Sequence, residues 1–119
     1  MSRVFILILI LDLILQEYLR HVDYGIMNSG VAFGLLQDSN WLGLAIFCIL
    51  VVMYKKLPKD LGIQMILGGG ITNLFVRLVH GSVWDYINLG IIKVNMSDII
   101  VCIGLTFFLY ETTRDHFSK

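Results

Sequence analysis

The chain has 119 residues, of which 57% are hydrophobic and only 15% charged, and its mean hydropathy is +0.80. A soluble domain of this size has too high a surface-to-volume ratio to hide so much apolar surface in its core. The formal net charge is zero and the basic residues are scattered, which argues against a nucleic-acid partner.

Four apolar segments predict four transmembrane helices, because a helix satisfies its own backbone groups within lipid. They lie at about 4–18, 41–54, 61–79 and 95–112. The first two fall short of the roughly 20 residues that span a bilayer, so flanking residues or local thinning must complete them. The first is expected to be retained, because Asp12 interrupts it and no small-residue cleavage site follows. The expected fold is an all-α membrane protein, a four-transmembrane-helix bundle that forms a single domain over 1–119.

The basic residues predict the orientation of this bundle. If both termini lie on one side, that side carries six lysines and arginines and the other side three, so the positive-inside rule makes the termini cytoplasmic. The six are Arg3, Lys55, Lys56, Lys59, Arg114 and Lys119, and the three are Arg20, Arg77 and Lys93. Segments 17–40 and 80–94 are then extracytoplasmic. The apolar and turn residues of the first of these predict short strands, a small β-like region on the membrane surface.

Polar side chains gather near the predicted outer end of the bundle, where such groups are costly and need a reason. Residues three or four positions apart on a helix share a face, which brings the polar residues of the third helix together and likewise those at the start of the fourth. The triple glycine at 68–70 predicts close approach of a neighbouring helix. The polar set comprises Asn28, Asn73, Arg77, Asp85, Asn95 and Asp98.

Two carboxylates in this set, Asp85 and Asp98, approach one another from the two sides of a tight outer connection. Like charges at close range cannot both ionise, so such a pair shares a proton and holds an acid and a base together. It can activate a water molecule for attack on a peptide carbonyl without a metal or a covalent intermediate. The structural alternative is that Asp85 is a solvated acid in a loop and that Asp98 is an acid whose charge is favoured by the dipole at a helix N-terminus.

Other polar residues leave alternatives open. Arg77 either reaches the lipid headgroups or pairs with a carboxylate. Asp12 either ties two helices together or lies as a carboxylate near the outer end. The three histidines lack metal-ligand spacing, so no metal or cofactor is predicted. The outer serines have no neighbouring base, which argues against a serine nucleophile.

Four segments follow one another in an order and spacing that match a known family. They are NSGVAFG at 28–34, LGGGITNLFVR at 67–77, HGSVWDYI at 80–87 and VNMSDII at 94–100. They are similar to N-x-G-x-A-F, G-G-x-x-x-N-L-x-D-R, G-x-V-x-D-F and F-N-x-A-D-x-x-I, the motifs of the lipoprotein signal peptidases, also called signal peptidase II. They are spread over residues 28–100, which is most of the chain after Met27.

The resemblance implies an aspartyl endopeptidase of the bacterial cytoplasmic membrane. This family removes the signal peptide of a prolipoprotein at the outer face, just before a cysteine that carries a diacylglyceryl group. Asp85 and Asp98 would be the catalytic dyad, with no cofactor. The partners would be the lipid-modified prolipoprotein and membrane lipids, and a monomer is expected. The residues that would support the site or bind substrate are Asp12, Asn28, Gly30, Asn73, Arg77 and Asn95.

Several positions depart from the family pattern. Val76 replaces an aspartate, and Leu15 and Gln16 replace the last two residues of Asp-x-x-(Thr or Ser)-Lys, which Asp12 begins. These departures keep a second hypothesis open, a catalytically degenerate relative that binds lipoproteins or acts as a membrane adaptor. A proton-linked transporter built around Asp12 and Asp98 has less support, because the chain has no inverted repeat.

Overall fold

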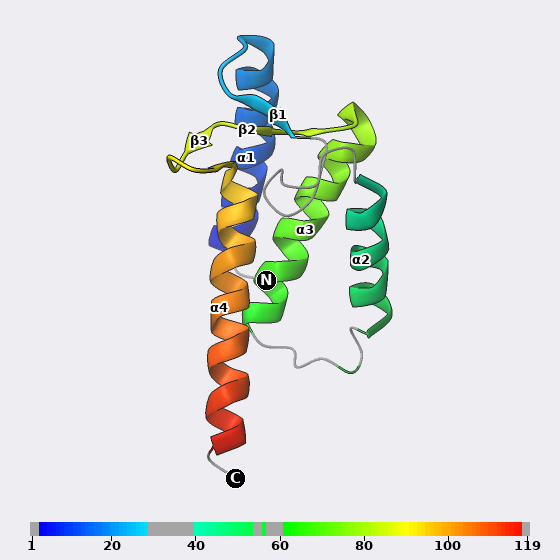
Figure 1. The fold of residues 1–119 in the computed structure, drawn as a ribbon, viewed down its shortest axis with the longest axis vertical. Coiled ribbons are helices and arrows are strands. Elements are labelled where there is room, and N and C mark those ends of the chain that lie inside the picture. The colour runs from blue at the N-terminus through cyan, green and yellow to red at the C-terminus, as the bar shows by residue number, and fades with distance from the viewer. Residues whose placement is uncertain (1–2, 29–39, 54–55, 57–60, 118–119) are drawn as a thin grey trace.

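The computed structural model describes residues 3–28, 40–53, 56 and 61–117. Figure 1 shows long helices that run alongside one another and strands that cross one end of the molecule, opposite the end where the chain finishes. The helices are α1 (Arg3–His21), α2 (Asn40–Met53), α3 (Leu61–His80) and α4 (Met96–Phe117). The strands are β1 (Ile26–Asn28), β2 (Val83–Asp85), β3 (Ile87–Asn88) and β4 (Lys93–Val94). The chain is therefore mostly helical, as predicted.

Helix α3 is the centre of the bundle, because it contacts each of the other three helices. Its contact with α4 is close: a Cβ added at Gly69 would lie 2.7 Å from the carbonyl oxygen of Ser97. A Cβ at Gly62 or at Gly104 would lie 2.7 Å from the carbonyl oxygen of the other. The close backbone approach predicted from the triple glycine is confirmed at Gly69.

Helix α1 extends to His21, beyond the apolar segment that predicted it, and ends in a Schellman motif. The amide of Tyr24 donates to the carbonyl of Leu19 at 2.9 Å, and the amide of Asp23 donates to that of Arg20 at 3.3 Å. Asp23 has the left-handed φ of 61° that this motif requires. The motif turns the chain back toward β1, so the end of α1 lies beside the strands.

The strands form two antiparallel pairs. β1 pairs with β2, with Ile26 opposite Asp85 and Asn28 opposite Val83, and β3 pairs with β4. Asp85 therefore lies in a strand, whereas the sequence indicated only a loop after the third helix. Pairing with β1 fixes the backbone on which this carboxyl group is carried.

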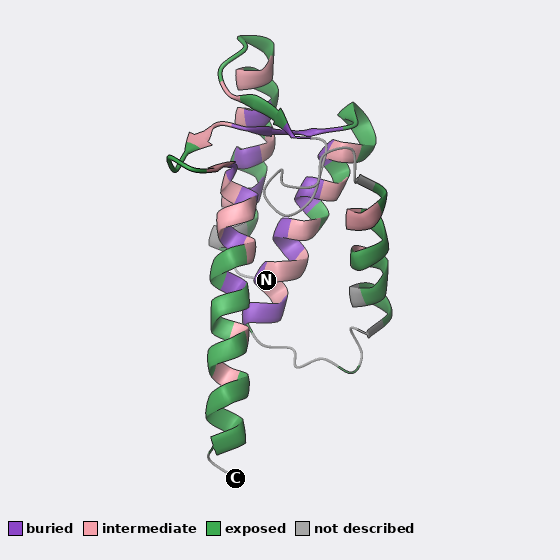
Figure 2. Ribbon diagram, in the orientation of Figure 1, coloured by how far each residue is buried: buried purple, intermediate pink, exposed green. Residues whose placement is uncertain are grey.

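In the described part of the chain many polar side chains are buried and many large apolar side chains are exposed. Figure 2 shows buried positions on the strands and along the length of α3, whereas the far half of α4 is mostly exposed. Large apolar side chains such as Leu7, Val52 and Leu78 are 65–80% exposed. The buried polar residues are Asp12, Gln16, Asn28, Thr72, Asn73, Ser82, Asp85, Asn95 and Ser97. Lipid as the solvent accounts for this distribution, because it leaves apolar side chains outside and requires polar groups to pair within.

Two of the described helices are long and apolar enough to cross a membrane, Leu61–His80 and Met96–Phe117. Helix α1 has 19 residues but carries four charged side chains, and α2 has only 14 residues.

Candidate active site

Asp85 is almost fully buried, with 1% of its surface exposed. Its carboxylate accepts a hydrogen bond from the Asn28 side chain at 2.9 Å and another from the Asn95 side chain at 3.1 Å. Asn28 is held next to it because β1 and β2 are paired, and Asn95 directly precedes α4. Three separate segments thus meet at one carboxyl group.

Asp98 lies in the first turn of α4 and closes a capping box with Asn95. The Asn95 side-chain oxygen accepts from the Asp98 amide at 2.9 Å, and the Asp98 carboxylate accepts from the Asn95 amide at 3.1 Å. This reciprocal pair satisfies two backbone donors that a helix start leaves open. Asp98 therefore stabilises the start of α4, as the structural alternative predicted. Its second carboxylate oxygen remains available for other contacts.

That second oxygen connects Asp98 to Asp85 through two amide side chains. Asn73 on α3 donates to Asp98 Oδ1 at 2.8 Å and accepts from Asn95 Nδ2 at 3.2 Å. Asn95 Nδ2 donates in turn to Asp85 Oδ1. Asn95 therefore contacts both carboxylates, and the two acids belong to one hydrogen-bonded network.

The electrostatic surroundings favour a shared proton on this pair. Burial, together with the nearby negative charge of Asp98, raises the pKa of Asp85 to about 7. The hydrogen bonds from Asn28 and Asn95 and the positive charge of Arg77 oppose this shift only in part. A carboxyl group that holds its proton near neutral pH beside a second carboxylate can serve as an acid while its neighbour serves as a base.

A cavity of about 200 Å³ opens beside Asp98, between α2, α3 and α4. Arg77 and Asn73 line its polar end together with Asp98, and the rest of its wall is apolar. Arg77 lies inside the bundle here, close enough to the two acids for its charge to act on Asp85. Of the two alternatives for Arg77, the structure thus supports an electrostatic partner of the carboxylates. The remaining lining residues are Gly43, Ile46, Phe47, Ile66, Gly70, Leu74 and Val101.

Asp12 is fully buried and ties α1 to the start of α4. Its carboxylate accepts from the Met96 amide at 3.2 Å and from the Ser97 hydroxyl at 2.5 Å. The Tyr86 hydroxyl also donates to it at 2.5 Å. Burial and the Asp12 charge raise the pKa of Tyr86, which keeps that phenol a donor. Of the two alternatives for Asp12, the structure thus supports the polar connection between two helices.

Sequence reasoning missed three residues of this second network, Gln16, Tyr86 and Ser97. Gln16 donates to Asp12 Oδ2 at 2.8 Å and is only 1% exposed. A signal for it existed, because a polar residue four positions after Asp12 lies on the same helix face. Tyr86 and Ser97 reach Asp12 across more than seventy residues of sequence, and no local pattern could have indicated that.

The structure thus brings together Asp85, Asp98, Asn28, Asn73, Asn95 and Arg77, with Asp12 in an adjoining network. Gly30 lies outside the described residues. Among the residues that the structure describes, no group of three or more His, Cys, Asp or Glu side chains is placed to hold a metal ion.

The comparison with known proteins identifies the family. The sequence model of the Signal peptidase (SPase) II family matches residues 4–114 of this chain. The chain belongs to the signal peptidase II family. Its members are aspartic-type membrane peptidases, so the degenerate-adaptor hypothesis is not favoured.

Signal peptidase II relatives share a substantial part of this sequence. The lipoprotein signal peptidase of Wigglesworthia glossinidia brevipalpis is 37% identical over 102 residues, which cover 72% of this chain and 67% of the relative. That of Blochmanniella pennsylvanica is 33% identical over 115 residues, which cover 78% of this chain and 70% of the relative. The suspected resemblance is therefore confirmed.

Two solved structures described as bacterial membrane enzymes share the fold of this chain. One, at 2.3 Å resolution, matches with a TM-score of 0.74 at 21% identity and covers 98% of this chain and 91% of its own. The other, at 1.9 Å resolution, has a TM-score of 0.64 at 19% identity and covers 94% of both chains. At these low sequence identities the structural likeness shows a shared fold alone.

Proposed function

We propose that this chain removes signal peptides from diacylglyceryl-modified prolipoproteins at the outer face of the bacterial cytoplasmic membrane, with Asp85 and Asp98 as its catalytic dyad. One observation carries the proposal: the buried carboxylate of Asp85 and the half-buried carboxylate of Asp98 share a hydrogen-bonded network through Asn95 and Asn73, beside a mostly apolar cavity. The family membership supports the reaction class.

The chemistry needs one proton on the two carboxyl groups. The ionised member takes a proton from a water molecule, whose oxygen attacks the carbonyl carbon of the scissile peptide. The protonated member donates to the carbonyl oxygen as the tetrahedral intermediate forms. When the carbon–nitrogen bond breaks, the proton taken from water goes to the leaving amine, and the former carbonyl oxygen returns its proton to the pair, which again holds one proton. The pair titrates as a unit, so neither aspartate is assigned one fixed role.

The surroundings of the pair suit a substrate that is part peptide and part lipid. The cavity beside Asp98 has an apolar wall from α2, α3 and α4, which can take apolar groups that enter from the bilayer. Asn28, Asn73 and Asn95 hold the carboxylates in place, and Arg77 supplies a positive charge where negative charge develops in the intermediate.

The topology proposed with this function has four membrane-spanning helices at about 3–21, 40–53, 61–80 and 96–117 in one membrane domain, with both termini in the cytoplasm. The exposed apolar side chains on all four helices support it, as does the excess of basic residues near the termini and in segment 54–60. Helix α2 is short at 14 residues, so adjoining residues or a thinner bilayer must complete its span. The strands then lie at the outer surface.

The test is cleavage of a purified diacylglyceryl-modified prolipoprotein by the protein in detergent or liposomes. Asp85→Asn and Asp98→Asn should each abolish cleavage while the protein remains folded by size-exclusion chromatography. Asp23→Asn is a matched control, because this acid is exposed and its left-handed backbone suits asparagine. Undiminished turnover in either dyad variant, or binding of the substrate without cleavage by the unmutated protein, would defeat the proposal.

A further inference from the structure

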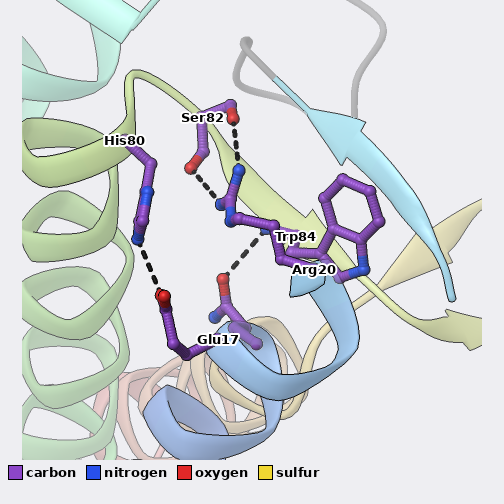
Figure 3. Close-up of polar contacts among 6 residues, drawn as sticks. Glu17, Arg20, His80, Ser82 and Trp84 are labelled. Carbon is purple, nitrogen blue, oxygen red and sulfur yellow. Dashed lines mark hydrogen bonds and ion pairs between the residues drawn. The ribbon is translucent and has the colours of Figure 1, made fainter. Parts of the chain in front are cut away.

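Side chains near the C-terminal end of α1 make polar contacts with the segment that ends in the strand of Asp85. Figure 3 shows side chains of α1 facing the chain from His80 to Trp84. Arg20 donates to the Ser82 hydroxyl at 3.2 Å and to the Ser82 carbonyl at 2.8 Å, and its guanidinium lies over the Trp84 ring, 5.3 Å from the centroid. Glu17 pairs with His80 at 2.8 Å. These contacts fix the path of the chain between α3 and β2.

Gln16 makes the most buried contact in this group. Its side-chain oxygen accepts the Trp84 amide at 2.9 Å, and Trp84 is the residue directly before Asp85. A backbone amide held at that position constrains the next peptide, because strand geometry leaves few soft torsions between them. On its other side β2 is held by β1, with Met27 opposite Trp84. Gln16 thus fixes β2 from the side of α1.

The same side chain reaches the element that carries Asp98. Gln16 Nε2 donates to Asp12 Oδ2, and Asp12 accepts from the Met96 amide and the Ser97 hydroxyl at the first turn of α4. An acidic group at this position is favoured by the helix dipole and by the open amides of the first turn. Asp98 follows Ser97 directly. Covalent and hydrogen bonds thus link Asp85 to Asp98 by way of Trp84, Gln16, Asp12 and Ser97. This set of contacts is separate from the hydrogen bonds that Asn95 makes to the two acids.

We infer that Gln16 is a positioning residue for the proposed peptidase reaction, whose amide sets the distance between the strand of Asp85 and the helix of Asp98. The inference rests on the proposed function. It assigns Gln16 no contact with substrate. Its effect acts through the placement of the two acids, and displacement of a reacting group by about 1 Å can lower a rate roughly a hundredfold.

An amide fits both contacts that Gln16 makes. The Trp84 amide requires an acceptor, and the Asp12 carboxyl oxygen at this contact requires a donor. Lysine, the residue that the signal peptidase II pattern has at this position, can only donate, and an ionised glutamate can only accept. The pocket beside Gln16 is also lined by Val76, which stands where the pattern has an aspartate. Two of the departures from the pattern, at positions 16 and 76, thus lie together, and in this chain a neutral amide stands where the pattern has a charged residue.

Three substitutions separate the two contacts. Gln16→Met keeps the length of the side chain and removes both hydrogen bonds. Gln16→Glu keeps an acceptor for Trp84, and Gln16→Lys keeps a donor for Asp12. Thr72→Val is the matched control, because it removes a buried hydrogen bond of 3.0 Å, from Thr72 to the Gly68 carbonyl, that lies within α3 and involves neither acid. For each variant kcat and KM are measured on the lipidated prolipoprotein, together with the unfolding midpoint in detergent.

The expected result is a fall of about 10- to 100-fold in kcat for Gln16→Met, with KM within about threefold of the unmutated protein. Gln16→Glu and Gln16→Lys should each lose kcat as well, although each retains one contact. Thr72→Val should keep its kcat even if its unfolding midpoint drops. Should Gln16→Met fail to fold, Gln16→Glu carries the test.

Three results would overturn the inference: full kcat in the Gln16 variants, a rise in KM with kcat unchanged, or an equal loss of kcat in Thr72→Val. Asp85→Asn, assayed in parallel, separates this failure from failure of the proposed function. If Asp85→Asn is inactive and the Gln16 variants are fully active, only the positioning role falls. If Asp85→Asn cleaves normally, the proposed function falls, and the positioning role falls with it.

Discussion

The carboxyl group of Asp85 illustrates how burial creates reactivity at the scale of one residue. With 1% of its surface exposed it has lost its hydration, and two amide donors replace that hydration only in part. The free energy of the charged form rises, which is why its pKa rises to about 7. A group that holds a proton near neutral pH is useful for acid–base chemistry and unfavourable for stability once it ionises.

The raised pKa of Asp85 predicts how stability changes with pH. In the unfolded chain an aspartate ionises near pH 4, whereas in the folded protein Asp85 ionises near pH 7, so between these values the folded state binds more protons. The contribution of Asp85 to stability is therefore present below about pH 4 and is lost as the pH rises through about 7. Asp85→Asn should remove this part of the pH dependence. Unfolding midpoints of both proteins in detergent from pH 5 to 8 test it, and parallel curves would contradict it.

Asn95 combines two roles that substitution can separate. Its side-chain oxygen caps α4, and its side-chain nitrogen connects Asp85 with Asn73. Serine can cap but cannot make the second connection, whereas alanine can do neither. Asn95→Ser and Asn95→Ala should both lose most turnover, because Asp85 loses a donor in each. Asn95→Ala should be less stable than Asn95→Ser by about 1 kcal/mol. Equal stability of the two variants would count against the capping role, and retained turnover in either against the connecting role.

At the scale of elements, the contact between α3 and α4 determines how the two halves of the site meet, since Asn73 lies on α3 and Asp98 on α4. Gly69 and Gly70 are adjacent but differ in their surroundings. A Cβ at Gly69 would lie 2.5 Å from Val101 Cγ2 and 2.7 Å from the Ser97 carbonyl, whereas a Cβ at Gly70 would meet only the Phe47 ring at 3.6 Å or more.

Alanine at these two glycines should therefore have opposite effects. Gly69→Ala should force α3 and α4 apart, lower the unfolding midpoint and reduce turnover, because a contact below 3.0 Å with backbone cannot be absorbed by a side-chain rotation. Gly70→Ala should be neutral or stabilising, because alanine gains up to about 1 kcal/mol of helix propensity over glycine and meets no close contact. Thermal unfolding and prolipoprotein cleavage, measured for both glycine variants, test this prediction. A stable, active Gly69→Ala would show that the helices can separate freely.

How far the sequence predicted these elements depends on the range of the interactions that form them. The helices could be predicted because their segments are long and mostly apolar. Asn73 and Arg77 could be placed on one face because residues four positions apart on a helix lie close together. Short strands were predicted for segment 17–40, where β1 lies, but β2 has only three residues, too few for an alternating pattern, so the sequence could not place Asp85 in a strand. Gln16 and Trp84 are 68 residues apart, and only the folded chain shows that they meet.

At the scale of the whole molecule, the polar network lies at one end and the apolar surface covers the rest. Helix α4 has 22 residues, about 33 Å at 1.5 Å per residue, which is enough to cross the hydrocarbon core. Its first turn carries Asp98, and its last turn carries Arg114 and His116. The proposed reaction site and the C-terminal end of α4 therefore lie on opposite sides of a bilayer if α4 spans it.

This arrangement predicts which positions a membrane-impermeant thiol reagent reaches in intact cells. Cys48 and Cys102 are first replaced by alanine in a protein that still cleaves prolipoprotein, because both are exposed on helix surfaces. Single cysteines are then introduced by Ile91→Cys in the turn between β3 and β4, by Lys56→Cys between α2 and α3, and by Asp115→Cys near the end of α4. Ile91→Cys should react in intact cells, whereas the other two should react only after lysis.

The three positions together constrain the number of spans as well as the orientation. Because β1 pairs with β2, the segment after α1 must lie on the same side as Asp85 and therefore on the side of residue 91. Protection of Lys56→Cys then requires the chain to return across the membrane before α3, which is the span assigned to the short helix α2. Labelling of Lys56→Cys in intact cells would mean that α2 does not cross. Labelling of Asp115→Cys together with protection of Ile91→Cys would invert the molecule and place the two acids in the cytoplasm.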